Sequence, residues 1–176
     1  MSKTQAEAKF IALRAAVITI SDSRTVENDT SGDYLAESLR ASGHQLSYRA
    51  IVKDDLYVLR AELSALIAKQ EIDVVLTTGS TGLTGRDLAP EALEPLFDKS
   101  IDGFGELFRA ASRGDIGAAT IQSRAFAGLA NGTLVFCMPG SPNACRTAWE
   151  EVIRPQLDSR TGPCNLATLM PRFTEK

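Results

Sequence analysis

Three glycines, spaced three residues apart, follow a short apolar run in the middle of the chain. Val74 to Leu76 are apolar, and glycines stand at positions 79, 82 and 85. Glycines at the carboxyl end of a strand let backbone N–H groups approach a ligand closely, and the N-terminus of the next helix favours anions. Ligands of open α/β sheets bind at this end of the strands. The pattern predicts a phosphate-binding loop over Gly79–Asp87, although a glycine-rich turn without a ligand has the same composition.

This loop does not fit the two common phosphate-binding templates. No lysine follows the glycines as in G-x-x-x-x-G-K-[ST], and the spacing G-x-x-G-x-x-G differs from G-x-G-x-x-G. A second turn, Pro139-Gly140-Ser141-Pro142, also lies between an apolar run and an expected helix start. Ser141 is a good N-cap residue, and Pro142 suits the first helical position. The chain therefore has two candidate anion-binding turns.

Three carboxylates, Asp54, Asp87 and Glu91, each follow an expected strand. Because the carboxyl ends of parallel strands meet at one edge of a sheet, we expect these side chains to gather near the two turns. Mg²⁺ commonly bridges phosphates to one or two acidic side chains, so the pattern suggests a divalent metal. Structural alternatives exist: Asp54 could cap the next helix, Asp87 could hold a turn or pair with Arg86, and Glu91 could complement a helix dipole.

Other side chains that could carry chemistry give weaker signals. His44 directly follows a glycine at an expected helix end, so we expect a structural role for it. Because it is the only histidine, histidine-based triads and histidine-rich metal sites are excluded. Ser141 does not lie in a G-x-S-x-G nucleophile motif. Arg109, Arg113 and Arg124 could belong to a basic pocket, but solvated charges on a helix face are the favoured explanation.

The composition excludes several classes of protein. The chain of 176 residues suits one domain with a single sizeable core. Its net charge of -3 argues against nucleic-acid binding over a broad surface. No apolar run reaches the about 18 residues of a membrane span, and the first residues lack the apolar core of a signal peptide, so we expect a cytoplasmic protein without a membrane partner.

The three cysteines do not indicate a disulfide framework or a zinc site, because their number is odd and no CxxC pair occurs. Cys137 lies in an apolar run and Cys145 in an expected helix, so both are expected to be core residues. Cys164 lies near the end of the chain, and its position leaves its role open.

Strands and helices alternate along most of the chain. Short apolar or alternating runs predict strands near 15–20, 46–52 and 74–76, and a hairpin over 125–137 around Asn131-Gly132. Helical spacing and capping residues predict helices over about 30–42, from Asp54 or Asp55 onward, over 90–97, from 101 to near Gly114, and from Ser141 to near Pro155. Residues 158–176 look irregular. The order predicts an α/β fold, a three-layer α/β/α sandwich with a mostly parallel, mixed central sheet.

Several short motifs occur together in one order. They are Ile20-Ser21-Asp22, Asp29-Thr30-Ser31-Gly32, Ile51-Val52-Lys53-Asp54, Thr78-Gly79-Ser80-Thr81-Gly82, Arg86-Asp87, Pro90-Glu91-Ala92 and Met138-Pro139-Gly140-Ser141-Pro142. In these residues the chain resembles the molybdenum cofactor biosynthesis MoaB/Mog family, and most closely its MoaB branch. The resemblance covers about residues 14–165, which would form the molybdopterin-binding domain between a flexible segment, 1–13, and a tail, 166–176.

The resemblance implies an activity and the residues for it. Related enzymes transfer AMP from ATP to the terminal phosphate of molybdopterin, with Mg²⁺, and assemble as homotrimers or homohexamers in a pathway with other proteins. By analogy, Asp54 and Asp87 would be the catalytic and metal-binding carboxylates, with Glu91 assisting. The substrate-binding residues would be Ser21, Thr78, Gly79, Ser80, Thr81, Gly82, Glu91, Pro139, Gly140 and Ser141.

Two positions depart from the family pattern. Ser80 stands where the family usually has a second glycine, so its side chain could narrow the loop or its hydroxyl could replace a water. Ala89 precedes Pro90 where the Mog branch commonly has a capping threonine, which predicts a weakly capped helix. These departures, and members of the MoaB branch without a clear catalytic role, keep open a non-catalytic molybdopterin-binding or carrier protein of the same pathway.

Overall fold

One mixed sheet of six strands forms the centre of the computed structural model, which describes residues 9–69 and 71–175. The strand order is β2-β1-β3-β6-β5-β4. The strands span Arg14–Ile20 (β1), Gln45–Val52 (β2), Val74–Thr78 (β3), Lys99–Ser100 (β4), Phe126–Ala130 (β5) and Thr133–Met138 (β6). The pairs β2–β1, β1–β3 and β3–β6 are parallel, whereas β5 runs antiparallel to β6 and to β4. The predicted mostly parallel, mixed sheet is confirmed.

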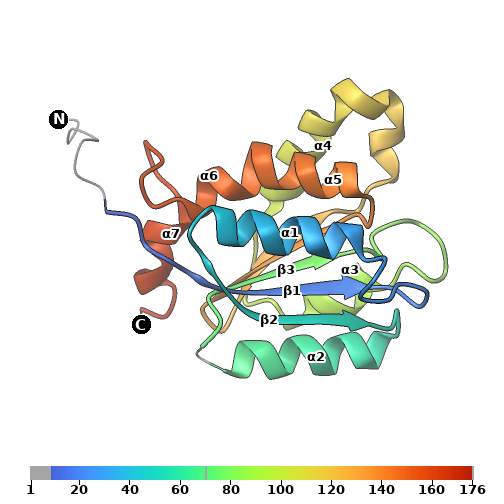
Figure 1. Ribbon diagram of the computed structural model, residues 1–176, viewed down its shortest axis with the longest axis horizontal. Coiled ribbons are helices and arrows are strands. Elements are labelled where there is room, and N and C mark those ends of the chain that lie inside the picture. Colours follow the sequence, from blue (N-terminus) through green and yellow to red (C-terminus); the bar gives the residue numbers. More distant parts are fainter. Residues whose placement is uncertain (1–8, 70, 176) are drawn as a thin grey trace.

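Helices cover both faces of this sheet, as expected for a three-layer α/β/α sandwich (Figure 1). One face carries α1 (Thr30–Ala41), α4 (Asp102–Ile116), α5 (Pro142–Thr147) and α6 (Arg154–Leu157). The other carries α2 (Leu56–Ala68) and α3 (Ala89–Leu93). Short turns of helix span Glu94–Leu96 (η2), Gly117–Gln122 (η3), Ala148–Ile153 (η4), Leu166–Leu169 (α7) and Met170–Arg172 (η5). No helix within 9–69 and 71–175 is long and apolar enough to cross a membrane.

The sheet separates two apolar cores. Alternate residues of β1 point to opposite faces, so Val17 joins one core and Ile18 the other. The larger core contains Trp149 and Phe136, and the smaller one contains Leu63 of α2. Cys137 and Cys145 are buried in these cores, and burial raises their pKa values to about 12 and about 11, which keeps both thiols protonated. This agrees with the core role expected for both, whereas Cys164 is exposed.

The hairpin was predicted correctly, but several element ends differ from expectation. Asn131 and Gly132 both have positive φ and form the turn between β5 and β6, as expected. Helix α1 is capped by the Asp29 side chain rather than by Thr30 or Ser31. Helix α4 continues past the expected end near Gly114 to Ile116.

The helix that was expected to end near Pro155 instead continues to Leu157. The segment Ala148–Ile153, which ends two residues before this proline, has π-helical hydrogen bonding. Such a widened turn accommodates the proline ring and the hydrogen bond that proline cannot donate. The tail expected to be irregular contains α7, whose start is capped by the Asn165 side chain.

The start of the described chain packs on its end. Of the segment 1–13 that we expected to be flexible, residues 1–8 lie outside the described part, and the Ile11 N–H group donates to the Ser159 hydroxyl at 2.9 Å. The Phe10 ring lies against the His44 ring, with centroids 5.2 Å apart. The Nδ1 atom of buried His44 accepts from the Leu13 N–H group at 3.2 Å. His44 is therefore a structural residue, as its position after Gly43 suggested.

We expect mild acid to destabilise the fold through His44. Burial, partly opposed by the Asp158 charge, lowers its pKa below the ordinary 6.5. Just below pH 6.5, His44 therefore binds more protons in the unfolded chain than in the folded chain. The free energy of unfolding is highest above this pH and decreases as the pH falls. The denaturation midpoint of the wild type should decrease between about pH 7.5 and about pH 5.5. His44→Asn keeps an acceptor without titrating, and an equal decrease in this variant would contradict the prediction.

Candidate functional site

The two predicted anion turns meet at the carboxyl edge of the sheet. Thr19, Thr78 and Met138 are neighbours in the β1–β3–β6 register, so the loops that follow these strands leave side by side. The Gly79 N–H group donates to the Met138 carbonyl at 2.9 Å. A Cβ atom at Gly140 would lie 3.3 Å from the Gly79 Cα atom. The loops are thus packed backbone against backbone, which makes one site of them.

Hydroxyl groups from neighbouring elements fix the second turn. The Thr78 hydroxyl donates to the Pro139 carbonyl at 3.0 Å, and the Ser31 hydroxyl donates to the Gly140 carbonyl at 2.8 Å. The Ser141 hydroxyl accepts from the Ala144 N–H group at 3.2 Å and caps α5, as its position before Pro142 suggested. Because these hydroxyl groups bind its carbonyl groups, the turn has a fixed shape before any ligand binds.

Ser21 follows β1 at the same edge of the sheet. Its hydroxyl accepts from the N–H groups of Ser23 and Arg24 and so holds its own turn. Ser21 also lines a cavity of about 90 Å³ together with Thr78 and Gly140. The structure therefore places Ser21 beside the second anion turn, with its side chain committed to the local backbone.

Asp54 stands at the end of β2 and does not cap α2, because the Asp55 side chain does. One Asp54 carboxylate oxygen, Oδ1, accepts from the Ser80 hydroxyl at 2.7 Å. Burial raises the pKa of Asp54, and the charges of Asp22 and Asp87 add to this, against the hydrogen bonds from Ser80 and the Leu88 backbone. This accumulation of negative charge would attract a cation.

Asp87 holds the far end of the glycine loop. Its Oδ2 atom accepts from the Thr84 hydroxyl at 2.7 Å and from the Thr84 N–H group at 2.8 Å. Burial opposes ionisation, but these bonds and one from the Gly82 N–H group outweigh it and lower the pKa of Asp87. Arg86 pairs with Asp22 instead of Asp87. The turn alternative for Asp87 is thus observed, and its carboxylate stays charged beside Asp54.

Arg124 ties the glycine loop to the start of α3, a role that was missing from our sequence analysis. Its guanidinium donates to the Gly82 carbonyl and to the Asp87 carbonyl, both at 2.7 Å, and pairs with Glu91. The Arg124 N–H group also donates to the Thr81 carbonyl at 3.0 Å. Only a three-dimensional arrangement brings Arg124 to these groups, since they lie more than 30 residues away in sequence. Glu91 is therefore engaged by an arginine rather than free to bind a metal.

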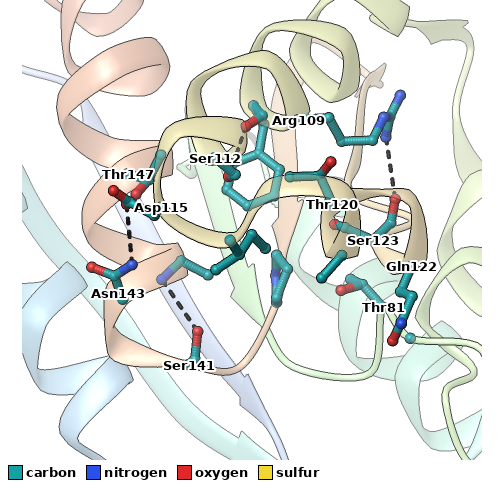
Figure 2. A pocket seen from close by; sticks show the side chains of 16 residues that line it. Thr81, Arg109, Ser112, Asp115, Thr120, Gln122, Ser123, Ser141, Asn143 and Thr147 are labelled. Carbon is teal, nitrogen blue, oxygen red and sulfur yellow. Dashed lines mark hydrogen bonds between the residues drawn. The ribbon is translucent and has the colours of Figure 1, made fainter.

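A cavity of about 230 Å³ opens between the two turns (Figure 2). Thr81 and Gly82 line one side, and Ser141 and Asn143 line the other. Helix α4 and the η3 turn complete the wall with a mixture of apolar and polar side chains, including Phe108, Arg109, Ser112, Asp115, Ile116, Ala119, Thr120 and Gln122. An open, mostly apolar cavity with a few polar groups beside two candidate anion turns suits a small organic ligand that carries a phosphate.

The acidic groups can provide part of a magnesium site. Among residues 9–69 and 71–175, no three His, Cys, Asp or Glu side chains are grouped closely enough to hold a metal ion. Mg²⁺ is usually held by one or two carboxylates together with substrate phosphates, and does not require a complete protein cage. The raised pKa of Asp54 beside Asp22 and Asp87 is consistent with such an open arrangement.

Comparison with known proteins identifies the family. A family model described as "Probable molybdopterin binding domain" matches residues 16–159. Molybdenum cofactor biosynthesis protein B of Escherichia coli K12 is 56% identical over 162 residues, which are 92% of this chain and 95% of that protein. The chain belongs to the MoaB/Mog family. The resemblance noted in the sequence is therefore confirmed.

Solved structures of the MoaB/Mog family have the same fold. The crystal structure of a molybdenum cofactor biosynthesis protein B matches with a TM-score of 0.84 and 40% identity, over 94% of this chain and 98% of that one. A Mog protein from Mycobacterium ulcerans matches with a TM-score of 0.77 and 24% identity, over 92% and 99% of the two chains. The higher identity to the first protein agrees with the MoaB branch, whereas the second comparison supports the fold alone.

Proposed function

We propose that this protein transfers AMP from ATP to the terminal phosphate of molybdopterin during molybdenum cofactor biosynthesis. The observation that carries the proposal is the direct packing of Gly79 against Gly140, which joins two anion-binding turns beside Asp54 and Asp87. Two such turns within one site could hold the two phosphate groups that react. Membership of the molybdopterin-binding family supplies the second substrate.

The reaction requires alignment of charged groups more than acid–base catalysis. An oxygen of the molybdopterin phosphate attacks the α-phosphorus of ATP, and the bond from that phosphorus to the bridging oxygen of pyrophosphate breaks. The attacking oxygen is already ionised at neutral pH, so a chain with one buried histidine suffices. Holding the attacking and leaving oxygens in line, and offsetting their repulsion, accounts for most of the catalysis.

The glycine loop and the second turn would hold the phosphates. The backbone N–H groups of Ser80, Thr81, Gly140 and Ser141 lie at the carboxyl edge of the sheet, where anions are favoured. Those of Gly79 and Gly82 already donate to the Met138 carbonyl and to the Asp87 carboxylate. Thr81 lines the cavity of about 230 Å³, which would accept an organic ring of one substrate. Arg124 would act indirectly by fixing the carbonyl groups of Gly82 and Asp87.

Asp54 and Asp87 would hold a magnesium ion together with substrate phosphates. The ion, when bound, would neutralise charge on the phosphates of ATP. Asp87 would keep the ionised state that its hydrogen bonds favour, and the ion would offset the negative charges of Asp22 and Asp87 that act on Asp54. Glu91 would contribute through Arg124 and not as a ligand.

A molybdopterin carrier without catalysis is the second candidate. The observation that favours it is the use of Asp87 as a turn residue, since a carboxylate with that structural task need not also bind a metal. The test is to mix the purified protein with molybdopterin, ATP and Mg²⁺ and to separate the products. We expect adenylylated molybdopterin to form. Binding of molybdopterin with product at the background level would favour the carrier.

Assembly into homotrimers or homohexamers is proposed by analogy with the family. Leu107, Ile116 and Ile121 are exposed apolar side chains on α4 and η3, and Ile116 lines the cavity. Exposed apolar side chains are common at subunit interfaces. Light scattering should give a mass about three or six times the 18.9 kDa of one chain. The mass of a monomer would contradict the proposal.

A further inference from the structure

Ser80 has a backbone conformation that a residue with a side chain seldom adopts. Its φ angle is +61°, in the left-handed region, between Gly79 at +108° and buried Thr81. A Cβ atom makes this region unfavourable, and serine has no strong preference for it. A non-glycine residue remains in such a conformation only when the surrounding structure compensates, and such residues cluster at functional sites.

The compensation comes from the Ser80 hydroxyl, which makes three hydrogen bonds. It accepts from the N–H groups of Leu88 at 2.7 Å and Ala89 at 3.0 Å, and it lies 2.7 Å from Asp54 Oδ1. A hydroxyl has one proton and two lone pairs. Because the two N–H groups occupy the lone pairs, the hydroxyl proton can point only to Asp54. The bond to this carboxylate therefore has a defined direction.

Ser80 also supplies the cap that α3 lacks. Leu88 occupies the N-cap position and cannot accept a hydrogen bond with its side chain, and neither can Ala89. Orphan N–H groups at a helix start normally need such an acceptor. Ser80 provides it from eight residues away and so links the two departures from the family pattern: the serine performs the task that the alanine cannot.

We infer that Ser80 is a positioning residue that holds the Asp54 carboxylate against the start of α3. The inference rests on the proposed function, in which Asp54 acts directly. Within residues 9–69 and 71–175, Ser80 is the only side chain that donates a hydrogen bond to the Asp54 carboxylate, which is otherwise bound by the Leu88 backbone. Loss of the hydroxyl therefore removes the side-chain bond that fixes this carboxylate. A glycine at this position suits the backbone but cannot hold Asp54.

Two variants separate the backbone effect from the hydroxyl effect. Ser80→Ala removes the hydroxyl and keeps the unfavourable φ, whereas Ser80→Gly removes both. We expect Ser80→Ala to lower the unfolding temperature by about 2–4 °C, the size of a lost helix cap, and Ser80→Gly to recover part of this loss. We expect both to lower kcat for AMP transfer at least about tenfold and to change KM for ATP by less than about threefold.

Asn165→Ala is the matched control, because it removes the cap of α7 far from the site. It should lower the unfolding temperature while leaving kcat unchanged. If kcat of Ser80→Gly stays within about twofold of the wild type, Ser80 only caps α3 and does not position Asp54, which would overturn the inference. If the wild type forms no product, the proposed function fails, and the inference is then judged from a crystal structure of Ser80→Ala: an unmoved Asp54 carboxylate overturns it, and a displaced one supports it.

Discussion

Asp54→Asn is expected to lower kcat for AMP transfer by at least about 100-fold, the scale of losing one preorganised electrostatic group. The amide oxygen can still accept from Ser80, so the geometry around the side chain is kept. The charge that would hold Mg²⁺ beside the phosphates is lost. Rates measured at saturating ATP over a range of Mg²⁺ concentrations test this expectation.

The same substitution should leave the fold intact or stabilise it slightly. Burial and the charges of Asp22 and Asp87 raise the pKa of Asp54, so its ionised form is less favourable in the folded chain than in the unfolded chain. A neutral side chain removes this repulsion. A carboxylate that costs stability is typical of a functional site.

Asp55→Asn is the matched control for this prediction. Asp55 is the next residue, is exposed, and caps α2 through the N–H groups of Tyr57 and Val58. Asparagine is an equally good cap, so both stability and activity should be retained. Equal activity of the Asp54 and Asp55 variants would show that the carboxylate at position 54 has no part in the reaction.

Gly79→Ala is expected to cost at least about 3 kcal/mol of stability, the upper range for a strained backbone position with a steric clash. A Cβ atom at Gly79 would lie 2.3 Å from the Ile20 carbonyl oxygen, and φ is +108°. The clash is with backbone of β1, which cannot move without breaking the sheet. Because Gly79 also packs against Gly140, the substitution should separate the two turns. Chemical denaturation measures the loss.

Gly85→Ala belongs to the same loop and serves as the control. A Cβ atom there meets no other atom within 4 Å, and its φ is not in the left-handed region. The free energy of unfolding should therefore change by less than about 0.5 kcal/mol. If the two alanine variants were equally stable, close packing at Gly79 would not be what joins the turns.

Local patterns in the sequence were sufficient for most of the fold. The apolar run Ala15–Ile20 and the Asn131-Gly132 pair are properties of neighbouring residues, and the structure has the strand and the hairpin that they predict. Glycines and prolines within a few residues were sufficient to predict the two candidate anion turns, each between an apolar strand and the start of a helix.

Contacts over long distances in sequence were not predictable in this way. Arg124 reaches Gly82 and Asp87 only because β5 brings the preceding segment beside the glycine loop. The role of Ser80 as a cap also depends on how its loop folds back on α3. The helix continues past Pro155 together with a π-helical segment, Ala148–Ile153, and no local residue preference predicts such a segment.

The most direct measurement of the central claim follows the α-phosphate of ATP. In ATP labelled at the α-phosphate and mixed with the protein, molybdopterin and Mg²⁺, the label should become attached to molybdopterin, with one pyrophosphate released for each label transferred. ATP labelled at the γ-phosphate should release its label only in pyrophosphate. Attachment of the γ-label to molybdopterin, or binding of molybdopterin with no transfer of the α-label, would contradict the account.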